Sequence, residues 1–403
     1  MPRPCVHTCS QLHIAQSLST GVTRNVRASI LLYKNICDAK TTSYSPSLNS
    51  DFMSKLISGI QQIGIGVPNV HKAWKWYRKA FGIDIRMFEE AAEAELMTRY
   101  TGNEVHARHA VLALHMGGGA GMEIWQFTSR EPQPASFQGR LGDTGIFICK
   151  IKCKDATFMH AEHKRRGIES LGPVHTRADG RKHYYLNDPH GYPFEMVESD
   201  EWFGPAPYGG GVSGAVIGVS NMDKALALYR GVLGYDAVVV DETGIIPEWQ
   251  AIPGSDESYR RMVLRRSEPT AGPFSQILGG GEIELVQALD RKPRNLFENR
   301  FWGDLGYIHL CWDIRDMEAL GKELEAAGFP FTVNSASSFD MGEASGQFTY
   351  VEDPDSTWIE FVETHKIPIS KKMNWYLDTR KHSAGKALPK WMLRMLRFNR
   401  VKD

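Results

Sequence analysis

The chain has 403 residues, a formal net charge of +0 and 42% hydrophobic residues, which is the composition of an ordinary soluble protein long enough for two domains. The neutral charge gives no reason to expect a nucleic-acid partner, and no uninterrupted apolar run reaches the roughly 18 residues of a membrane span. The six cysteines form neither a CxxC pair nor a dense framework, which favours reduced thiols in the cytosol.

The first 52 residues differ from the rest of the chain. They are rich in Ser and Thr and contain no acidic residue before Asp38. This composition is typical of an organelle transit peptide, and the alternative is an extension upstream of a start at Met53. We therefore expect a cytoplasmic protein, or an imported one if residues 1–52 are a transit peptide, and we exclude them from the prediction of the fold.

A first structural unit covers about residues 57–128. An alternating strand pattern over 60–67 leads to Asn69, which can cap a helix that Gly82 ends. Strand patterns follow at 107–114 and 122–127. The glycines between them, 117–119, precede no helix pattern of the phosphate-binding kind, so we interpret them as a hairpin turn.

Three further units follow. The second covers 145–198, with a helix over 155–166 and a turn at 188–191, and a Pro- and Gly-rich linker at 205–211 precedes the third. The third covers 212–289, and its segment 245–258 shows no period, which predicts a loop and a lid candidate. The fourth has a strand at 307–312, a helix from Asp316 to Gly328, a turn at 353–356 and a last strand at 357–363.

The four units share a spacing pattern. Each has a reference position in its first strand, an Asn or Asp helix cap seven residues later, and a Gly nineteen or twenty residues later. Each last strand carries a Glu followed by an apolar residue. The reference positions are Gln62, Ile148, Gly214 and His309, and the strand-borne acids are Glu123, Glu195, Glu284 and Glu360. A repeat of this kind predicts four copies of one α+β unit.

The tail, residues 365–403, is basic, with Asp378 and Asp403 as its only acids and with apolar residues between the arginines at 391–398. One interpretation is a helix that makes weak contact with a membrane surface. We favour the other, a helix that packs its apolar side on the body of the protein.

Four βαβββ units with a reference position on the first strand and a Glu on the last resemble the vicinal oxygen chelate superfamily, which includes glyoxalase I, extradiol dioxygenases and bleomycin-resistance proteins. The resemblance covers about residues 57–363. It implies an α+β fold of two glyoxalase-like cup domains, 53–204 and 212–364, each with two βαβββ units, joined by the linker 205–211 and flanked by the extension 1–52 and the tail 365–403. It also implies that two units share a cup, and that each offers the metal one ligand from its first strand and one from its last.

The pairing of the units decides the ligand set. Ile148 and Gly214 have no side-chain donor. If neighbouring units pair, the two cups hold Gln62, Glu123 and Glu195, and Glu284, His309 and Glu360. If the first and fourth units pair, one cup holds Gln62, Glu123, His309 and Glu360, and the other is nearly empty.

We favour the second pairing, because it places every intact ligand in one cup and gives a set similar to that of glyoxalase I. One nitrogen and three oxygens suit one divalent ion such as Zn, Ni, Co or Mn, and Fe less, since an iron site of the dioxygenase kind needs a second His. We interpret His109, His115, His183 and His190, which lack matching partners, as structural or surface residues.

The resemblance implies a lyase or isomerase that acts on a small 2-oxo or thiohemiacetal substrate through an enediolate. Glu360 is the expected catalytic base, with Glu123 on the opposite face of the substrate. Two alternatives are an extradiol-type dioxygenase and a non-catalytic module that binds a small ligand. We expect a small-molecule substrate and no nucleic acid, and leave the oligomeric state and the use of glutathione open.

Overall fold

The computed structural model describes residues 55–335, 339–340, 345–370 and 375–402. The predictions made for residues 1–52 lie outside the described part, and all described residues belong to the unit Phe52–Asp403. In the ranges just given, no helix combines the length and apolar character needed to cross a membrane.

The first two units appear where the sequence predicts them. The first contains β1 (Leu56–Gly66), α2 (Val70–Phe81), β2 (Ile85–Glu93), η1 (Glu95–Tyr100), β3 (Ala107–Leu114) and β4 (Gly121–Phe127). The second contains β5 (Gly145–Cys153), α3 (Ala156–Arg165), β6 (His175–Thr176), β7 (Lys182–Asn187) and β8 (Pro193–Glu198).

The third and fourth units repeat this order. The third contains β9 (Gly209–Gly218), α4 (Met222–Leu226), η2 (Ala227–Val232), β10 (Ala237–Gly244), η3 (Pro247–Trp249), β11 (Tyr259–Arg265), α5 (Ser275–Leu278) and β12 (Glu282–Ala288). The fourth contains β13 (Gly306–Arg315), α6 (Met317–Ala326), β14 (Val333–Asn334), β15 (Phe339–Asp340), β16 (Ser345–Glu352) and β17 (Trp358–Ser370). Because β9 begins at Gly209, it takes in the last residues of the predicted linker.

The predicted helix caps are confirmed in all four units. The side chains of Asn69, Asp155, Asn221 and Asp316 each accept a hydrogen bond from the backbone N–H three residues later. Gly82 follows α2 with φ of 77°, in the left-handed region that glycine enters without strain. The third unit differs in one respect, since its helix continues as a π-helical segment, η2.

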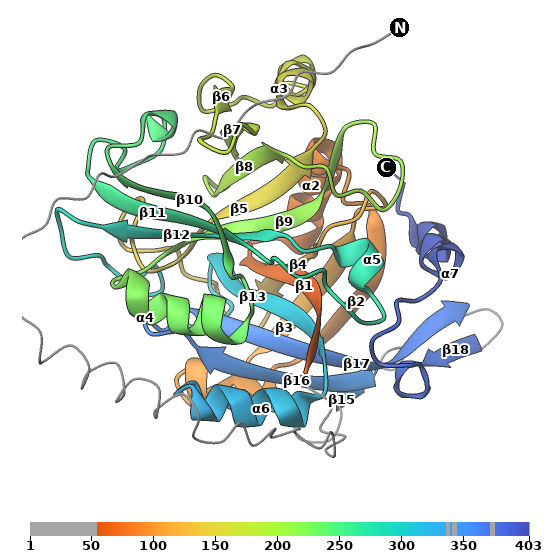
Figure 1. Cartoon of the computed structure of the whole chain (residues 1–403). Coiled ribbons are helices and arrows are strands. Elements are labelled where there is room, and N and C mark those ends of the chain that lie inside the picture. The colour runs from red at the N-terminus through yellow and green to blue at the C-terminus, as the bar shows by residue number, and fades with distance from the viewer. Residues whose placement is uncertain (1–54, 336–338, 341–344, 371–374, 403) are drawn as a thin grey trace, which may run out of the picture. The chain divides into compact units, whose positions relative to one another are not determined.

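The strands form two curled sheets, and each sheet takes one unit from each half of the chain. The first has the order β14-β16-β17-β13-β1-β4-β3-β2, with β15 and β18 (Trp375–Asp378) attached, and the second has the order β10-β11-β12-β9-β5-β8-β7-β6. The centre of the first sheet is the antiparallel pair β1–β13, so the first unit pairs with the fourth, as we favoured (Figure 1). The centre of the second is the pair β5–β9, from the second and third units.

Two equivalent tyrosine–aspartate contacts join the units within each half. The Tyr77 hydroxyl on α2 donates to Asp188 Oδ2 at 2.8 Å, in the turn before β8. The Tyr229 hydroxyl on η2 donates to Asp353 Oδ2 at 3.0 Å, in the turn before β17. These hydrogen bonds therefore connect the two units of each half of the chain, whereas the sheets connect units from different halves.

The tail packs on the body of the protein in part. Leu388 and Leu393, the latter on α7 (Lys390–Arg394), are buried in a cluster with Phe203 and Ile277. In contrast, the Trp391 side chain stays largely exposed. The tail therefore buries an apolar side, as we favoured, whereas contact with a membrane stays a prediction.

Candidate metal centre

Four neighbouring strands in the middle of the first sheet carry the four predicted ligands. Gln62 lies on β1, Glu123 on β4, His309 on β13 and Glu360 on β17. In each unit the last strand runs parallel to the first, which places Glu123 beside β1 and Glu360 beside β13. The antiparallel pair β1–β13 then brings the two units together, so all four side chains meet although they span almost 300 residues of sequence.

The donor atoms are spaced like the ligands of one ion. His309 Nε2 lies 3.2 Å from Glu123 Oε2 and 3.1 Å from Glu360 Oε2. The Gln62 amide donates to the same two oxygens at 3.0 and 3.3 Å. Ligands about 2.1 Å from a central ion lie roughly 3.0–3.4 Å apart in octahedral or tetrahedral geometry. The Gln62 amide offers Oε1 to an ion after rotation by about 180°.

His309 is held in one orientation. Its Nδ1 lies 3.3 Å from the Tyr350 hydroxyl, and its ring is parallel to that of Trp302 at 6.0 Å. Gly64 lies opposite His309 in the β1–β13 register, and a Cβ there would approach His309 Cε1 to 2.4 Å. The lack of a side chain at Gly64 therefore makes the space that the imidazole fills.

The electrostatics of His309 suit a cation. Burial alone would lower the pKa of His309, but the Glu360 and Glu123 carboxylates outweigh burial and raise the pKa to about 9. His309 Nε2 is buried and makes no well-directed hydrogen bond to any described residue, although both carboxylates lie close. A buried nitrogen without a directed partner, facing two carboxylates and an amide, fits a divalent ion of the borderline class.

The second sheet carries a different arrangement at the equivalent place. Glu195 and Glu284 correspond to Glu123 and Glu360, but Lys150 on β5 lies between them. Lys150 Nζ is 2.8 Å from Glu195 Oε2, 2.8 Å from Glu282 Oε1 and 2.5 Å from Glu284 Oε2. The ammonium of Lys150 thus supplies the positive charge that an ion would supply in the first sheet.

Further charges and apolar side chains complete the second sheet's interior. Arg261 Nε donates to Glu284 at 2.7 Å, and Arg177 donates to Glu282 at 2.5 Å. Trp249 and Ile252 of the lid candidate 245–258 are buried in one cluster with Ile148, the second unit's reference position. We expected this cup to be nearly empty of metal ligands. Its interior is filled by ion pairs and by the side chains of the loop 245–258.

Sequence reasoning missed two sets of partners. His183 Nδ1 lies 2.8 Å from Glu195 Oε1, and His109 Nε2 lies 3.2 Å from Glu89 Oε1, and neither contact was predicted. Lys150 was not singled out either. Its place two residues after Ile148, in a strand that is apolar except for Lys150 and Lys152, was the available signal for a buried ion pair.

His115 and His190 agree with a structural or surface role. His115 Nδ1 accepts from the backbone N–H of Gly117 at 2.8 Å in the predicted hairpin turn, and burial lowers the pKa of His115 to about 4. His190 is exposed next to Asp188.

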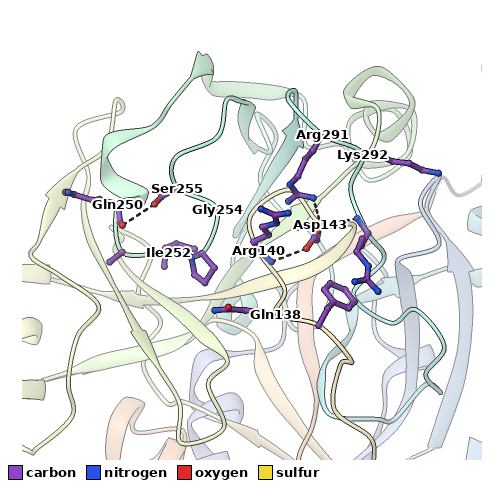
Figure 2. Close-up of a pocket in the computed structure, with 13 residues that line it drawn as sticks. Gln138, Arg140, Asp143, Gln250, Ile252, Gly254, Ser255, Arg291 and Lys292 are labelled. Carbon is purple, nitrogen blue, oxygen red and sulfur yellow. Dashed lines mark hydrogen bonds and ion pairs between the residues drawn. The ribbon is translucent and has the colours of Figure 1, made fainter.

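A cavity of about 730 Å³ lies elsewhere, between the segments 137–143, 250–255 and 291–294 (Figure 2). Two of its basic residues are paired with acids: Arg291 Nη1 contacts Asp143 Oδ1 at 2.5 Å, and Arg140 Nη1 contacts Glu257 Oε1 at 2.6 Å. The lining residues include none of the four predicted metal ligands.

Comparison with known proteins agrees with this architecture. The family model described as the Glyoxalase/Bleomycin resistance protein/Dioxygenase superfamily matches residues 59–196 and 211–361. The chain therefore belongs to this superfamily, and each matched segment covers two of the four units. No curated protein sequence matches the chain.

Solved structures are similar to the chain at low sequence identity. A putative dioxygenase from Bacillus subtilis subsp. subtilis str. 168 is 16% identical, with a TM-score of 0.50, and the match covers 77% of this chain and 86% of that one. A glyoxalase I mutant from Zea mays is 12% identical, with a TM-score of 0.49, and the match covers 77% and 94%. At 16% identity, the similarity to the Bacillus subtilis structure concerns the fold alone.

Proposed function

We propose that the protein is a divalent-metal-dependent, glyoxalase-like lyase or isomerase that acts on a small 2-oxo or thiohemiacetal substrate. The observation that carries the proposal is the convergence of Gln62, Glu123, His309 and Glu360, whose facing atoms lie 3.0–3.3 Å apart. We propose one ion of the Zn, Ni, Co or Mn kind for this set, since one imidazole and three oxygen donors suit that class.

The bound ion would act as a Lewis acid on a substrate carbonyl, which makes the hydrogen on the adjacent carbon more acidic. The protein supplies the group that takes this proton. We assign that role to the Glu360 carboxylate, whose side chain is 10% exposed and whose Oε2 lies 3.1 Å from His309 Nε2. The Glu123 side chain is 11% exposed and comes from β4, at the opposite end of the four strands from β17, and we assign to it a proton on the other face of the substrate.

Aromatic side chains from the first sheet and from the loop before β13 lie near His309. Trp125, Trp302 and Tyr350 belong to one buried cluster on the same face as His309. They keep water from the region around His309, which strengthens charge interactions there. The Tyr350 hydroxyl near His309 Nδ1 fixes the ring orientation and leaves Nε2 for the ion.

The ligand hypothesis is tested by metal titration of purified variants. His309→Ala removes the only nitrogen donor of the set, and Glu123→Ala removes a carboxylate from the other half of the chain, so in both variants this site should lose most of its affinity for Co²⁺ or Zn²⁺. Glu90→Gln is the matched control, because Glu90 lies in the same sheet and pairs with Arg108 outside the site. Unchanged affinity in both alanine variants would refute the four-ligand site.

The reaction class needs a separate assay. The metal-loaded protein is incubated in deuterated water with a 2-oxo aldehyde and a thiol, and we expect deuterium at the carbon next to the carbonyl, with loss of this exchange in Glu360→Gln. Oxygen consumption with a catechol and Fe²⁺, without deuterium exchange, would instead support the dioxygenase alternative. A protein that takes up no metal but binds small apolar ligands would support the non-catalytic alternative.

A further inference from the structure

A second cluster of metal-capable side chains lies outside the cup of the first sheet. His71 is in the first turn of α2, Glu89 is on β2 and His109 is on β3. One potential ligand atom from each residue lies within 4.8 Å of those of the other two. The cluster shares no residue with the group around His309.

The register of the sheet explains why these residues meet. In the antiparallel pair β2–β3, Glu89 lies opposite Val111 and Ala91 opposite His109, so Glu89 and His109 are diagonal neighbours on one face. That face also carries Val111, which belongs to the core that contains the buried residues of α2. His109 and Glu89 therefore face the helix, and His71 projects from the beginning of that helix.

The start of α2 is fixed against the same sheet. The backbone N–H of Val70 donates to Gln126 Oε1 at 2.9 Å, and Gln126 lies opposite His109 in the β3–β4 register. The Asn69 side chain also caps the helix by accepting from the backbone N–H of Lys72 at 2.9 Å. These contacts hold His71 above His109 without any contribution from the imidazoles themselves.

The distances within the cluster match those between ligands of a tetrahedral ion. Glu89 Oε1 lies 3.6 Å from His71 Nε2 and 3.2 Å from His109 Nε2. Two ligands bound about 2.1 Å from a tetrahedral ion lie roughly 3.4 Å apart. The two imidazole rings are nearly perpendicular, with centroids 5.1 Å apart, so they do not stack and both can direct Nε2 toward one point.

The carboxylate of Glu89 is oriented by a further contact. Arg86 Nη1 donates to Glu89 Oε2 at 2.8 Å, which leaves Oε1 to face both histidines. The His71 side chain is 60% exposed, so water has access to a fourth coordination position. Two imidazoles and one carboxylate are a common protein ligand set for zinc.

We propose that His71, Glu89 and His109 bind a second divalent ion of the zinc class, independently of the site around His309. The ion links the first turn of α2 to β2 and β3, and β2 is the terminal strand of the first sheet. Binding to the folded state alone stabilises that state, so the ion clamps the edge of the sheet to its covering helix.

The test counts ions and measures melting temperature on the full chain, with Co²⁺ and Zn²⁺ as probes. Wild type should bind two ions, and His309→Ala should keep one. His71→Gln should keep the ion at the site around His309, and the affinity of the site of His71, Glu89 and His109 should fall about tenfold or more. His71 is exposed, so this change should leave the fold intact. His190→Gln is the control for removal of an exposed histidine, and it should behave like wild type.

The decisive comparison is made in the His309→Ala background. There the added ion should raise the melting temperature, and His71→Gln or His109→Gln should abolish that rise. If His309→Ala binds no ion, or if His71→Gln changes neither ion count nor melting temperature, the proposal is overturned. If wild type binds one ion, and it is lost in His71→Gln but kept in His309→Ala, this site stands and the metal site of the proposed function fails.

Discussion

Lys150→Met tests how the second sheet holds its buried charges. The Lys150 side chain is fully buried, and its ammonium contacts Glu195, Glu282 and Glu284. Burial alone would lower the pKa of Lys150, but the three carboxylates outweigh burial and raise the pKa above its usual value. Methionine keeps most of the volume of the side chain and removes the charge.

The expected loss follows from the contacts that remain. Glu284 keeps Arg261 at 2.7 Å, Glu195 keeps His183 at 2.8 Å and Glu282 keeps Arg177 at 2.5 Å, but the cation shared by all three acids is gone. Removal of one partner from a buried ion pair typically destabilises a protein by about 3–5 kcal/mol. Since total stability is about 5–15 kcal/mol, the free energy of unfolding should fall by a large fraction.

Lys152→Met is the matched control. Lys152 lies two residues on in the same strand and is also buried. Among the described residues its ammonium donates to the backbone carbonyl of Glu201, at 2.7 Å, and it lies 5.0 Å from the Trp202 ring. Burial lowers the pKa of Lys152 to about 8, so its charge is poorly compensated. Denaturant unfolding at neutral pH should therefore show a much smaller loss for Lys152→Met. Equal losses for the two variants would refute the view that three carboxylates depend on Lys150.

Three further predictions concern single positions. Gly64→Ala should weaken metal binding and lower the melting temperature because its Cβ would meet His309 Cε1 at 2.4 Å, and the loss of stability should shrink in the His309→Ala background. Burial raises the pKa of Asp353 to about 6, so its contribution to stability is full below about pH 4 and is lost as the pH rises through about 6. Denaturant titrations should show that the free energy of unfolding changes by up to about 3 kcal/mol over this pH range and that Asp353→Asn removes the change. An Asp353→Asn variant with the same pH profile as wild type would contradict this prediction. Leu393→Ala should cost about 2–5 kcal/mol or release the tail to protease, because Leu393 is 2% exposed, and unchanged stability and digestion would show that the tail does not depend on it.

The elements of the fold were predictable because their signals are local. Asn69 and Asp316 cap helices by contacts with backbone three residues away, and Gly82 ends a helix through its own backbone freedom. Such signals survive in sequence without knowledge of the partners in space. The π-helical segment Ala227–Val232 has no comparable signal, and the sequence predicted an ordinary helix there.

The pairing of the units depends on contacts that no local pattern encodes. It could be inferred only from the distribution of side-chain donors, with Gln62 and His309 present and Ile148 and Gly214 unable to bind. The charge network around Lys150 could not be inferred in this way. Lys150 and Glu284 are 134 residues apart, and their contact exists only because β5 and β9 lie side by side.

The same pairing explains how a metal-capable site and a buried lysine coexist in one chain. Lys150 lies on β5, and in the observed sheet the antiparallel partner of β5 is β9. This pairing brings the ammonium of Lys150 into contact with Glu284. If neighbouring units paired instead, β5 would lie beside β1, and the ammonium would fall among Gln62, Glu123 and Glu195. A cation there would compete with an ion for the same carboxylates. Pairing across the halves keeps Lys150 away from Glu123. The first sheet therefore retains its four potential metal ligands, while in the second sheet the ammonium of Lys150 neutralises the buried carboxylates.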